Sequence, residues 1–155
     1  MGAYIWSVLL AAGAWSQPAP LTQDETARIA AQCVEPDLRE RPMAELTPGQ
    51  IQAIVACAMS NASVALNRQL PMRIDEITIL ESTTVDGTTL SYNGRIDLGA
   101  DEIVADAPQR LERASRTYVC SQADMVQTMS FGGAYAYSWV DREGAPVHRF
   151  VIRGC

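Results

Sequence analysis

Lysine is absent from this chain of 155 residues, and histidine occurs only once, at position 148. All 12 basic residues are therefore arginine, which excludes a lysine Schiff base, a lysine general base and the lysine of a phosphate-binding loop. Imidazole catalysis could use only His148, and it would need a free nucleophile beside that ring. No serine lies in a Gly-x-Ser-x-Gly turn either,. The common routes to an enzyme are thus missing, and we expect no catalytic activity.

A basic stripe and a set of metal ligands are also missing. The net charge is -6 and the sequence pI is about 4.7, whereas nucleic-acid binders need clustered positive charge to displace counterions from the phosphates. No Cys-x-x-Cys and no histidine pair provides the spacing of zinc ligands,. We therefore expect no nucleic-acid partner, no metal and no cofactor. The adjacent carboxylates of Asp75-Glu76 and Asp101-Glu102 would point apart on a strand, and we interpret them as surface residues rather than an acid–base pair,.

The N-terminal segment has the pattern of an export signal. Residues 4–14 are uncharged and apolar, and small residues follow before Gln17-Pro18-Ala19-Pro20,. The apolar run is too short for a bilayer, which takes about 20 residues to cross. No Lys or Arg precedes it, however, so an uncleaved interfacial anchor is the alternative,. We expect a signal peptide at 1–16, a linker at 17–21, one domain at 22–155, a periplasmic or secreted location and no permanent membrane span.

The chain has four cysteines, an even number, and in a chain that we expect to be exported this favours disulfide bonds. They are Cys33, Cys57, Cys120 and Cys155. Three pairings are possible. We favour Cys33–Cys57 and Cys120–Cys155, because each pair brackets one of the structural units described next.

Three helices are predicted from caps and periodicity. A helix over about 22–34 starts at Thr22, with Glu25 in the capping-box position, and it carries only small apolar residues, so it should lie on the surface,. A second over about 47–68 starts at Thr47-Pro48-Gly49-Gln50 and has a continuous apolar face,. A third starts at Pro108 and runs to about Met129, with a break near Cys120,. Residues 35–46 lack periodicity and are predicted to form a loop.

Two hairpins are predicted from alternating side chains. Residues 73–84 and 89–98 flank an Asp86-Gly87 turn, and residues 134–140 and 147–153 flank the turn at 141–144,. The order helix, strand, strand therefore occurs twice. We predict an α+β fold with a four-stranded antiparallel sheet from two helix-strand-strand units, helices on one face, and an additional N-terminal helix. This topology resembles PepSY-type modules and β-lactamase-inhibitor-type folds, which implies a small exported inhibitory or accessory domain.

The remaining candidate site is an aromatic stripe on the second and third strands of the predicted sheet. Its members are Tyr92, Tyr135, Tyr137 and Trp139. If these rings point to the open side of the sheet, they form a binding surface rimmed by Arg149 and Arg153; if they face the helices, they are core. We predict a protein-binding module of inhibitor, immunity or envelope-accessory type. The alternative is an unfamiliar enzyme or a small-ligand domain with a pocket between the helices and a curved sheet.

Overall fold

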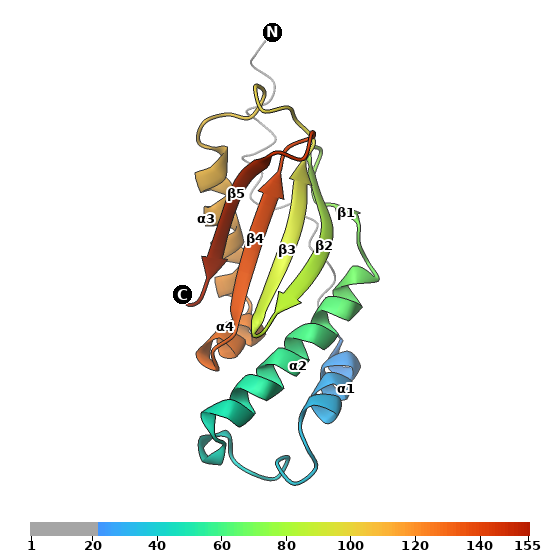
Figure 1. The fold of residues 1–155 in the computed structure, drawn as a ribbon, viewed down its shortest axis with the longest axis vertical. Helices are drawn as coiled ribbons and strands as arrows, with labels where there is room; N and C mark the ends of the chain where they lie inside the picture. The colour runs from blue at the N-terminus through green and yellow to red at the C-terminus, as the bar shows by residue number, and fades with distance from the viewer. Residues whose placement is uncertain (1–21) are drawn as a thin grey trace.

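The computed structural model describes residues 22–155, so the predicted signal peptide and linker lie outside the described residues. After α1, the chain forms two units in which a helix is followed by a β-hairpin, with one additional short strand, β1, in the first unit and two helices in the second (Figure 1). The elements are α1 (Gln23–Cys33), the 3-10 turn η2 (Met43–Glu45), α2 (Pro48–Asn67), β1 (Met72–Arg73), β2 (Thr78–Asp86), β3 (Thr89–Ile96), α3 (Ala107–Ser121), α4 (Ala123–Ser130), β4 (Ala134–Val140) and β5 (Pro146–Ile152).

Both predicted capping boxes start their helices. The Glu25 amide donates to Thr22 Oγ1 at 3.2 Å, and the Glu25 carboxylate accepts from the Thr22 amide at 2.8 Å. The reciprocal bonds at the start of α2 join Thr47 and Gln50 at 3.3 and 2.9 Å. These bonds satisfy amides that have no partner inside the helix, so the two local signals define where α1 and α2 begin.

The α+β class is confirmed, but the sheet has five strands in the order β1-β2-β3-β4-β5 and is mixed, so the prediction is wrong in the number of strands and in the direction of one pair. β3 and β4 pair in parallel, while each hairpin is antiparallel. Residues 97–133 contain α3 and α4 and bring the chain back to the end of the sheet where β3 began. A crossover of this kind makes neighbouring strands parallel.

The additional strand, β1, arises from a break inside the predicted strand 73–84. The Asp75 carboxylate accepts hydrogen bonds from the amides of Ile77 and Thr78 at 2.9 and 2.7 Å. An aspartate side chain that binds amides two and three residues onward stabilises a turn in place of a ladder. β1 therefore pairs with β2 through Met72 and Arg73 only.

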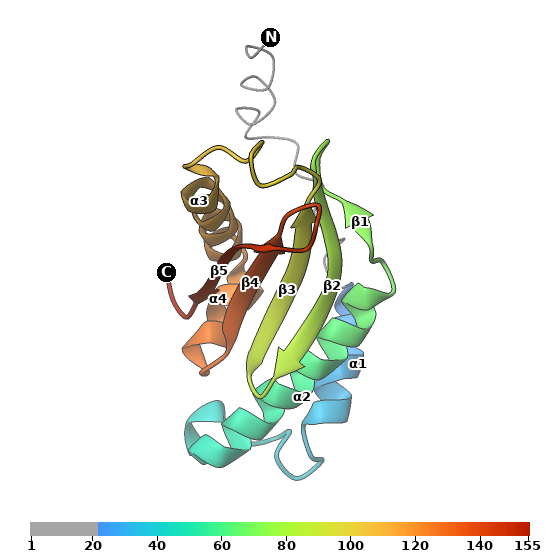
Figure 2. The same cartoon turned by 45° about the horizontal axis from the view of Figure 1, so that its top comes forward.

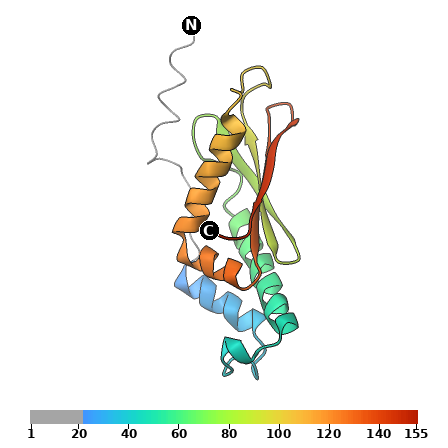
Figure 3. The same cartoon turned by 90° about the vertical axis from the view of Figure 1, so that its left-hand side faces the viewer.

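The helices cover one face of the sheet and leave the other open (Figure 3). Thr83 on β2 lies opposite Tyr92 on β3, and Tyr92 lies beside Tyr137 on β4, so these three side chains share the covered face. Ser63 on α2 reaches the same face, where its hydroxyl is 2.8 Å from that of Thr83. The structure is a two-layer α+β domain whose core lies between the helices and the sheet.

Two disulfide bonds join elements in the favoured pairing. Cys33 of α1 is bonded to Cys57 of α2, with Cα atoms 5.5 Å apart. Cys120 of α3 is bonded to Cys155 at the end of the chain, with Cα atoms 5.7 Å apart. The first bridge ties a helix that buries no residue of its own to the domain, and the second ties the end of β5 to the helical layer.

α2 is long and apolar enough to cross a membrane by length and composition, and it is the only such helix among residues 22–155. In the fold it packs on the sheet through Val55, Met59, Ser63 and Leu66. The Asn67 side chain also bonds the Thr83 backbone in both directions, at 2.9 and 2.7 Å. These contacts are those of a helix that packs on the core of a folded domain.

Candidate functional site

The aromatic stripe faces the helices and is buried. Tyr92, Tyr135, Tyr137 and Trp139 are each between 2% and 9% exposed. Tyr137 stacks between Tyr92 and Phe150, with ring centroids 5.0 and 5.2 Å apart. The candidate aromatic binding surface is therefore not on the surface, because burying these large rings removes more apolar area from water than burying the small residues opposite them.

Burial also suppresses ionisation of these tyrosines. Desolvation raises the pKa of Tyr135 from 10.0 to about 12, and it also raises the pKa values of Tyr92 and Tyr137 above the ordinary tyrosine value. A raised tyrosine pKa means that the neutral form is favoured in the folded protein. Well below pH 10 each tyrosine is neutral in both the folded and the unfolded chain, and from about pH 10 upward the unfolded chain loses these protons first.

We expect the free energy of unfolding to fall as pH rises from 10 towards 12, the pKa of Tyr135. Each tyrosine that ionises only in the unfolded chain contributes a slope of about 1.4 kcal/mol per pH unit. Denaturant unfolding at stepped pH, followed by far-UV circular dichroism, measures this slope. The Tyr135→Phe variant should lose one such contribution. An unchanged slope in that variant would contradict the burial of Tyr135.

A small cavity lies against the aromatic core, between α3 and the sheet. Its volume is about 20 Å³, and its lining includes Ser115, Tyr118 and Trp139. Sites for small organic ligands measure about 300–1,000 Å³, whereas this space is the size of a single water molecule. The structure therefore offers no support at this place for the alternative of a ligand pocket between helices and sheet.

Among residues 22–155, the side-chain hydrogen-bond partner of His148 is a carboxylate and not a nucleophile. Its Nε2 atom is 3.1 Å from Glu112 Oε2 on α3, and Cys120, the thiol that could have partnered it, is bonded to Cys155. Within residues 22–155, no group of three or more His, Cys, Asp or Glu side chains is arranged to hold a metal ion. The contact of His148 with Glu112 joins β5 to α3 and requires no catalytic explanation.

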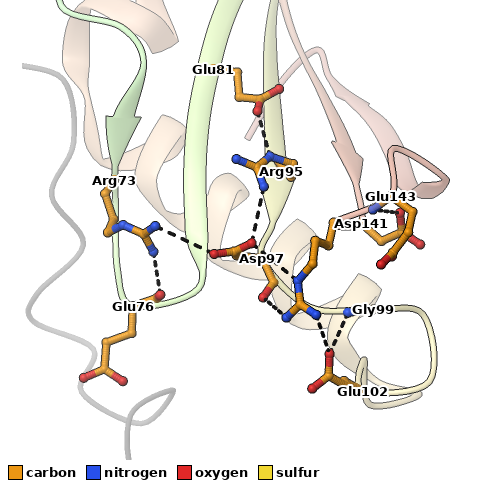
Figure 4. A network of polar contacts seen from close by, with 10 residues as sticks. Arg73, Glu76, Glu81, Arg95, Asp97, Gly99, Glu102, Asp141 and Glu143 are labelled. Carbon is orange, nitrogen blue, oxygen red and sulfur yellow. Dashed lines mark hydrogen bonds and ion pairs between the residues drawn. The ribbon is translucent and has the colours of Figure 1, made fainter.

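A network of charged side chains surrounds Asp97 at the end of β3 (Figure 4). The Asp97 carboxylate lies 3.8 Å from Arg73, 3.3 Å from Arg95 and 3.6 Å from Arg142. Glu81 pairs with Arg95, and Glu102 pairs with Arg142, at 2.8 and 3.3 Å. Three arginines thus meet three carboxylates at the surface. The ion pairs of Arg142 with Asp97 and Glu102 hold the β3–α3 loop against the β4–β5 turn. Because the positive and negative charges of the network balance, little net charge remains to bind a ligand.

Arg149 and Arg153, the two candidate rim residues, are both exposed. Arg149 faces the open side of the sheet beside Ser138, and the exposed Arg153 follows the end of β5. The aromatic surface that they were expected to border is on the covered face. The open face around Arg149 carries hydroxyl and amide side chains instead, among them Asn93, whose amide is 3.4 Å from Ser82 Oγ.

A larger hollow, which we call the α1–α2 groove, lies between α1, the loop after it and the start of α2. Its volume is about 430 Å³. Leu38 and Leu46 are both buried and form part of its lining, while Val34 and Ile54 are half-buried. The complete lining is Ala30, Ala31, Val34, Leu38, Arg39, Arg41, Leu46 and Ile54. This volume lies in the range of binding sites, and the lining is mainly apolar.

Two arginines border the α1–α2 groove, and they differ in what they bind. Arg39 donates from Nη2 to the Ala31 carbonyl at 2.6 Å and from Nε to the Val34 carbonyl at 3.1 Å. It therefore caps the C-terminal carbonyls of α1, a position that suits a cation. Arg41 is exposed and forms no ion pair with the residues described. Its charge remains available to a carboxylate outside the chain.

The sequence pattern did not reveal this groove. Its floor comes from Leu38 and Leu46, two isolated leucines in a charged stretch that has no helical or strand period. Its wall comes from the alanines of α1, which form only a weak apolar stripe on a surface helix. The available signal was the combination of a small-residue helix face with leucines in the following loop, close to a predicted disulfide.

These observations define a class: a disulfide-bonded, two-layer α+β domain with an apolar surface groove outside the core. Structures of bacterial export-related proteins share this fold. One is the type 2 secretion system pilotin EpsS of Vibrio vulnificus, which matches at TM-score 0.59 and 15% sequence identity and covers 67% of this chain and 92% of that chain. Another is the type II secretion system pilotin AspS of Vibrio cholerae, which matches at TM-score 0.56 and 14% sequence identity and covers 67% of this chain and 93% of that chain.

A third similar structure is a protein of Pseudomonas aeruginosa that is described as secreted. It matches at TM-score 0.56 and 19% identity and covers 64% of this chain and 91% of that chain. No protein-family model matches the sequence, and no curated protein matches it. The three likenesses show a shared fold and, at these identities, nothing finer.

Proposed function

We propose that this chain is a small exported accessory protein of the bacterial envelope that binds a segment of another protein and catalyses no reaction. The observation that carries the proposal is the α1–α2 groove, an apolar hollow of about 430 Å³. Two further features support it. Both cysteine pairs are bonded, as in proteins of oxidising compartments, and the fold is shared with two pilotins and a protein described as secreted.

The groove suits an apolar peptide segment that carries a carboxylate. Buried Leu38 and Leu46 and half-buried Ile54 present aliphatic surface to an occupant, and burying apolar area is the main source of binding free energy. Arg41 is the cation at the border that no described residue pairs with. An acidic side chain on the occupant would meet it there and set the orientation of the segment.

Replacing Ala31 with tryptophan is expected to abolish partner binding. Ala31 is exposed and lines the groove, so an indole at that position fills the space without disturbing the core. Ala53→Trp is the matched control, because Ala53 is exposed on α2 but does not line the groove. Capture from the envelope of the native host, with the wild-type chain and each variant as bait, gives the comparison.

A partner retained by wild type and Ala53→Trp and lost with Ala31→Trp supports the proposal. A photo-crosslinker at position 31 should then form an adduct with an apolar, acid-containing peptide of that partner, whereas one at position 53 should not. Equal capture by all three baits, or adducts of equal yield at both positions, would show that the groove is not the binding site.

A further inference from the structure

β5 is the outermost strand of the sheet, and its outer edge is not paired with any other strand among residues 22–155 (Figures 1 and 2). The strand is seven residues long and pairs with β4 over nearly all of that length. The edge of such a strand presents backbone amides and carbonyls in the geometry that a further strand needs. Its far end is held by the bond between Cys155 and Cys120, so the edge is fixed in place before any partner arrives.

The side chains of β5 give this edge a different charge on each side. On the covered side, His148 contacts Glu112 of α3. Arg149 lies on the open side, and Arg153 is the first residue after β5; both are exposed and form no ion pair with the described residues. They are four positions apart, which corresponds to about 13 Å along an extended chain. Two unpaired cations along a free edge are unusual in a chain whose net charge is -6.

These charges favour an acidic partner over a second copy of the chain. If two β5 edges paired around a two-fold axis, the arginines of both copies would gather on the same side of the joint. No carboxylate of β5 would be present between them, and like charges facing each other across strands are destabilising. An extended segment with acidic residues at alternate positions has the opposite effect, because its carboxylates face Arg149 and Arg153.

We propose that β5 is a second binding site, which accepts an extended acidic segment of a partner protein as a sixth strand of the sheet. Backbone hydrogen bonds to β5 supply part of the affinity, and ion pairs with Arg149 and Arg153 select the segment. This site is separate from the α1–α2 groove, because no residue of β5 or α3 lines the groove. A result that contradicts the function proposed for the groove would therefore not contradict this second site, and the reverse also holds.

The test uses the oxidised chain and a short blocked peptide that alternates glutamate with threonine. Binding is followed by NMR chemical shifts and by amide hydrogen exchange, at low salt because exposed charge pairs are screened. We expect the shifts and slowed exchange to concentrate on β5. The Arg149→Glu/Arg153→Glu variant should bind about tenfold more weakly. The matched control is Arg28→Glu/Arg113→Glu, which makes the same change in net charge at exposed positions on α1 and α3 and should bind as the wild type does.

Two further peptides separate strand addition from simple charge attraction. A glutamate–threonine peptide methylated at alternate backbone nitrogens cannot donate along one edge and should not bind, and a lysine–threonine peptide should not bind either. Equal loss of affinity in both double variants, binding of the methylated peptide, or a saturated complex with unchanged β5 amides would each overturn the proposal. Dimers of the free chain with protected β5 amides would also overturn it, because the edge would then belong to a second copy. Ala31→Trp should leave this binding unchanged.

Discussion

Replacing Trp139 with alanine is expected to lower the free energy of unfolding by about 3–5 kcal/mol, the usual cost of removing a buried aromatic side chain. Trp139 is 2% exposed and lies over the strand residue Gly94. The indole therefore fills space above a residue that has no side chain, and its removal leaves a cavity as well as losing buried area. Urea unfolding followed by circular dichroism measures the change. Ser138→Ala, the neighbouring position on the open face, is the control and should have only a small effect.

The contact between Trp139 and Gly94 permits a sharper form of the same test. A Cβ atom built on Gly94 would lie 2.7 Å from Trp139 Cε3, which is closer than two carbon atoms can approach. Gly94→Ala alone should therefore cost about 1–3 kcal/mol through overpacking. In the Trp139→Ala background the clash with the indole is removed and only the 3.0 Å approach to the Ile79 carbonyl oxygen remains, so the cost should be smaller,. Equal costs in both backgrounds, or a Trp139→Ala variant as stable as wild type, would place the indole outside the core.

The starts of the helices and the positions of the hairpins could be predicted, because their causes are local. A capping box needs only Thr22 with Glu25, or Thr47 with Gln50, and the first hairpin turn needs only Asp86-Gly87, where Gly87 has φ of 55°. The parallel pairing of β3 with β4 could not be predicted in this way. Alternation of side chains defines the two faces of a strand but not its direction, which depends on where the connection through α3 and α4 returns the chain.

The orientation of the aromatic stripe was open in the sequence for a related reason. In β4, Ala134 and Ala136 alternate with Tyr135 and Tyr137, so the sequence puts apolar residues on both faces of this strand. All four residues are buried in the structure. The tyrosines face the helices because the larger rings fill the space between layers, while the alanines are covered by their neighbours on the open face. The α1–α2 groove was hidden because it is assembled from segments that only the tertiary structure brings together, the loop leucine Leu38 and the α2 residue Ile54.

Removing either disulfide is expected to cost about 3–4 kcal/mol in the chain-entropy model, because the bonded cysteines are 24 and 35 residues apart. The two losses should differ in where they act. The Cys120→Ser/Cys155→Ser variant frees the end of β5 from α3, so the whole domain should unfold at a lower urea concentration. The Cys33→Ser/Cys57→Ser variant frees α1, a helix that buries no residue of its own. Hydrogen exchange in α1 should then become fast while the strands stay protected.

The local loosening of α1 after loss of the Cys33–Cys57 bond links stability to the proposed function. α1 supplies Ala30 and Ala31 to the groove, and after loss of the Cys33–Cys57 bond it is held mainly by its packing on α2 and by Arg39 at its C-terminus. Partner binding at the groove should fall with the Cys33→Ser/Cys57→Ser variant even at temperatures where the sheet is fully folded. The Cys120→Ser/Cys155→Ser variant should bind normally under the same conditions, because its change is remote from the groove. If both variants lost binding in parallel with global stability, the groove would have no separate dependence on α1, and the bridge between α1 and α2 would serve the fold alone.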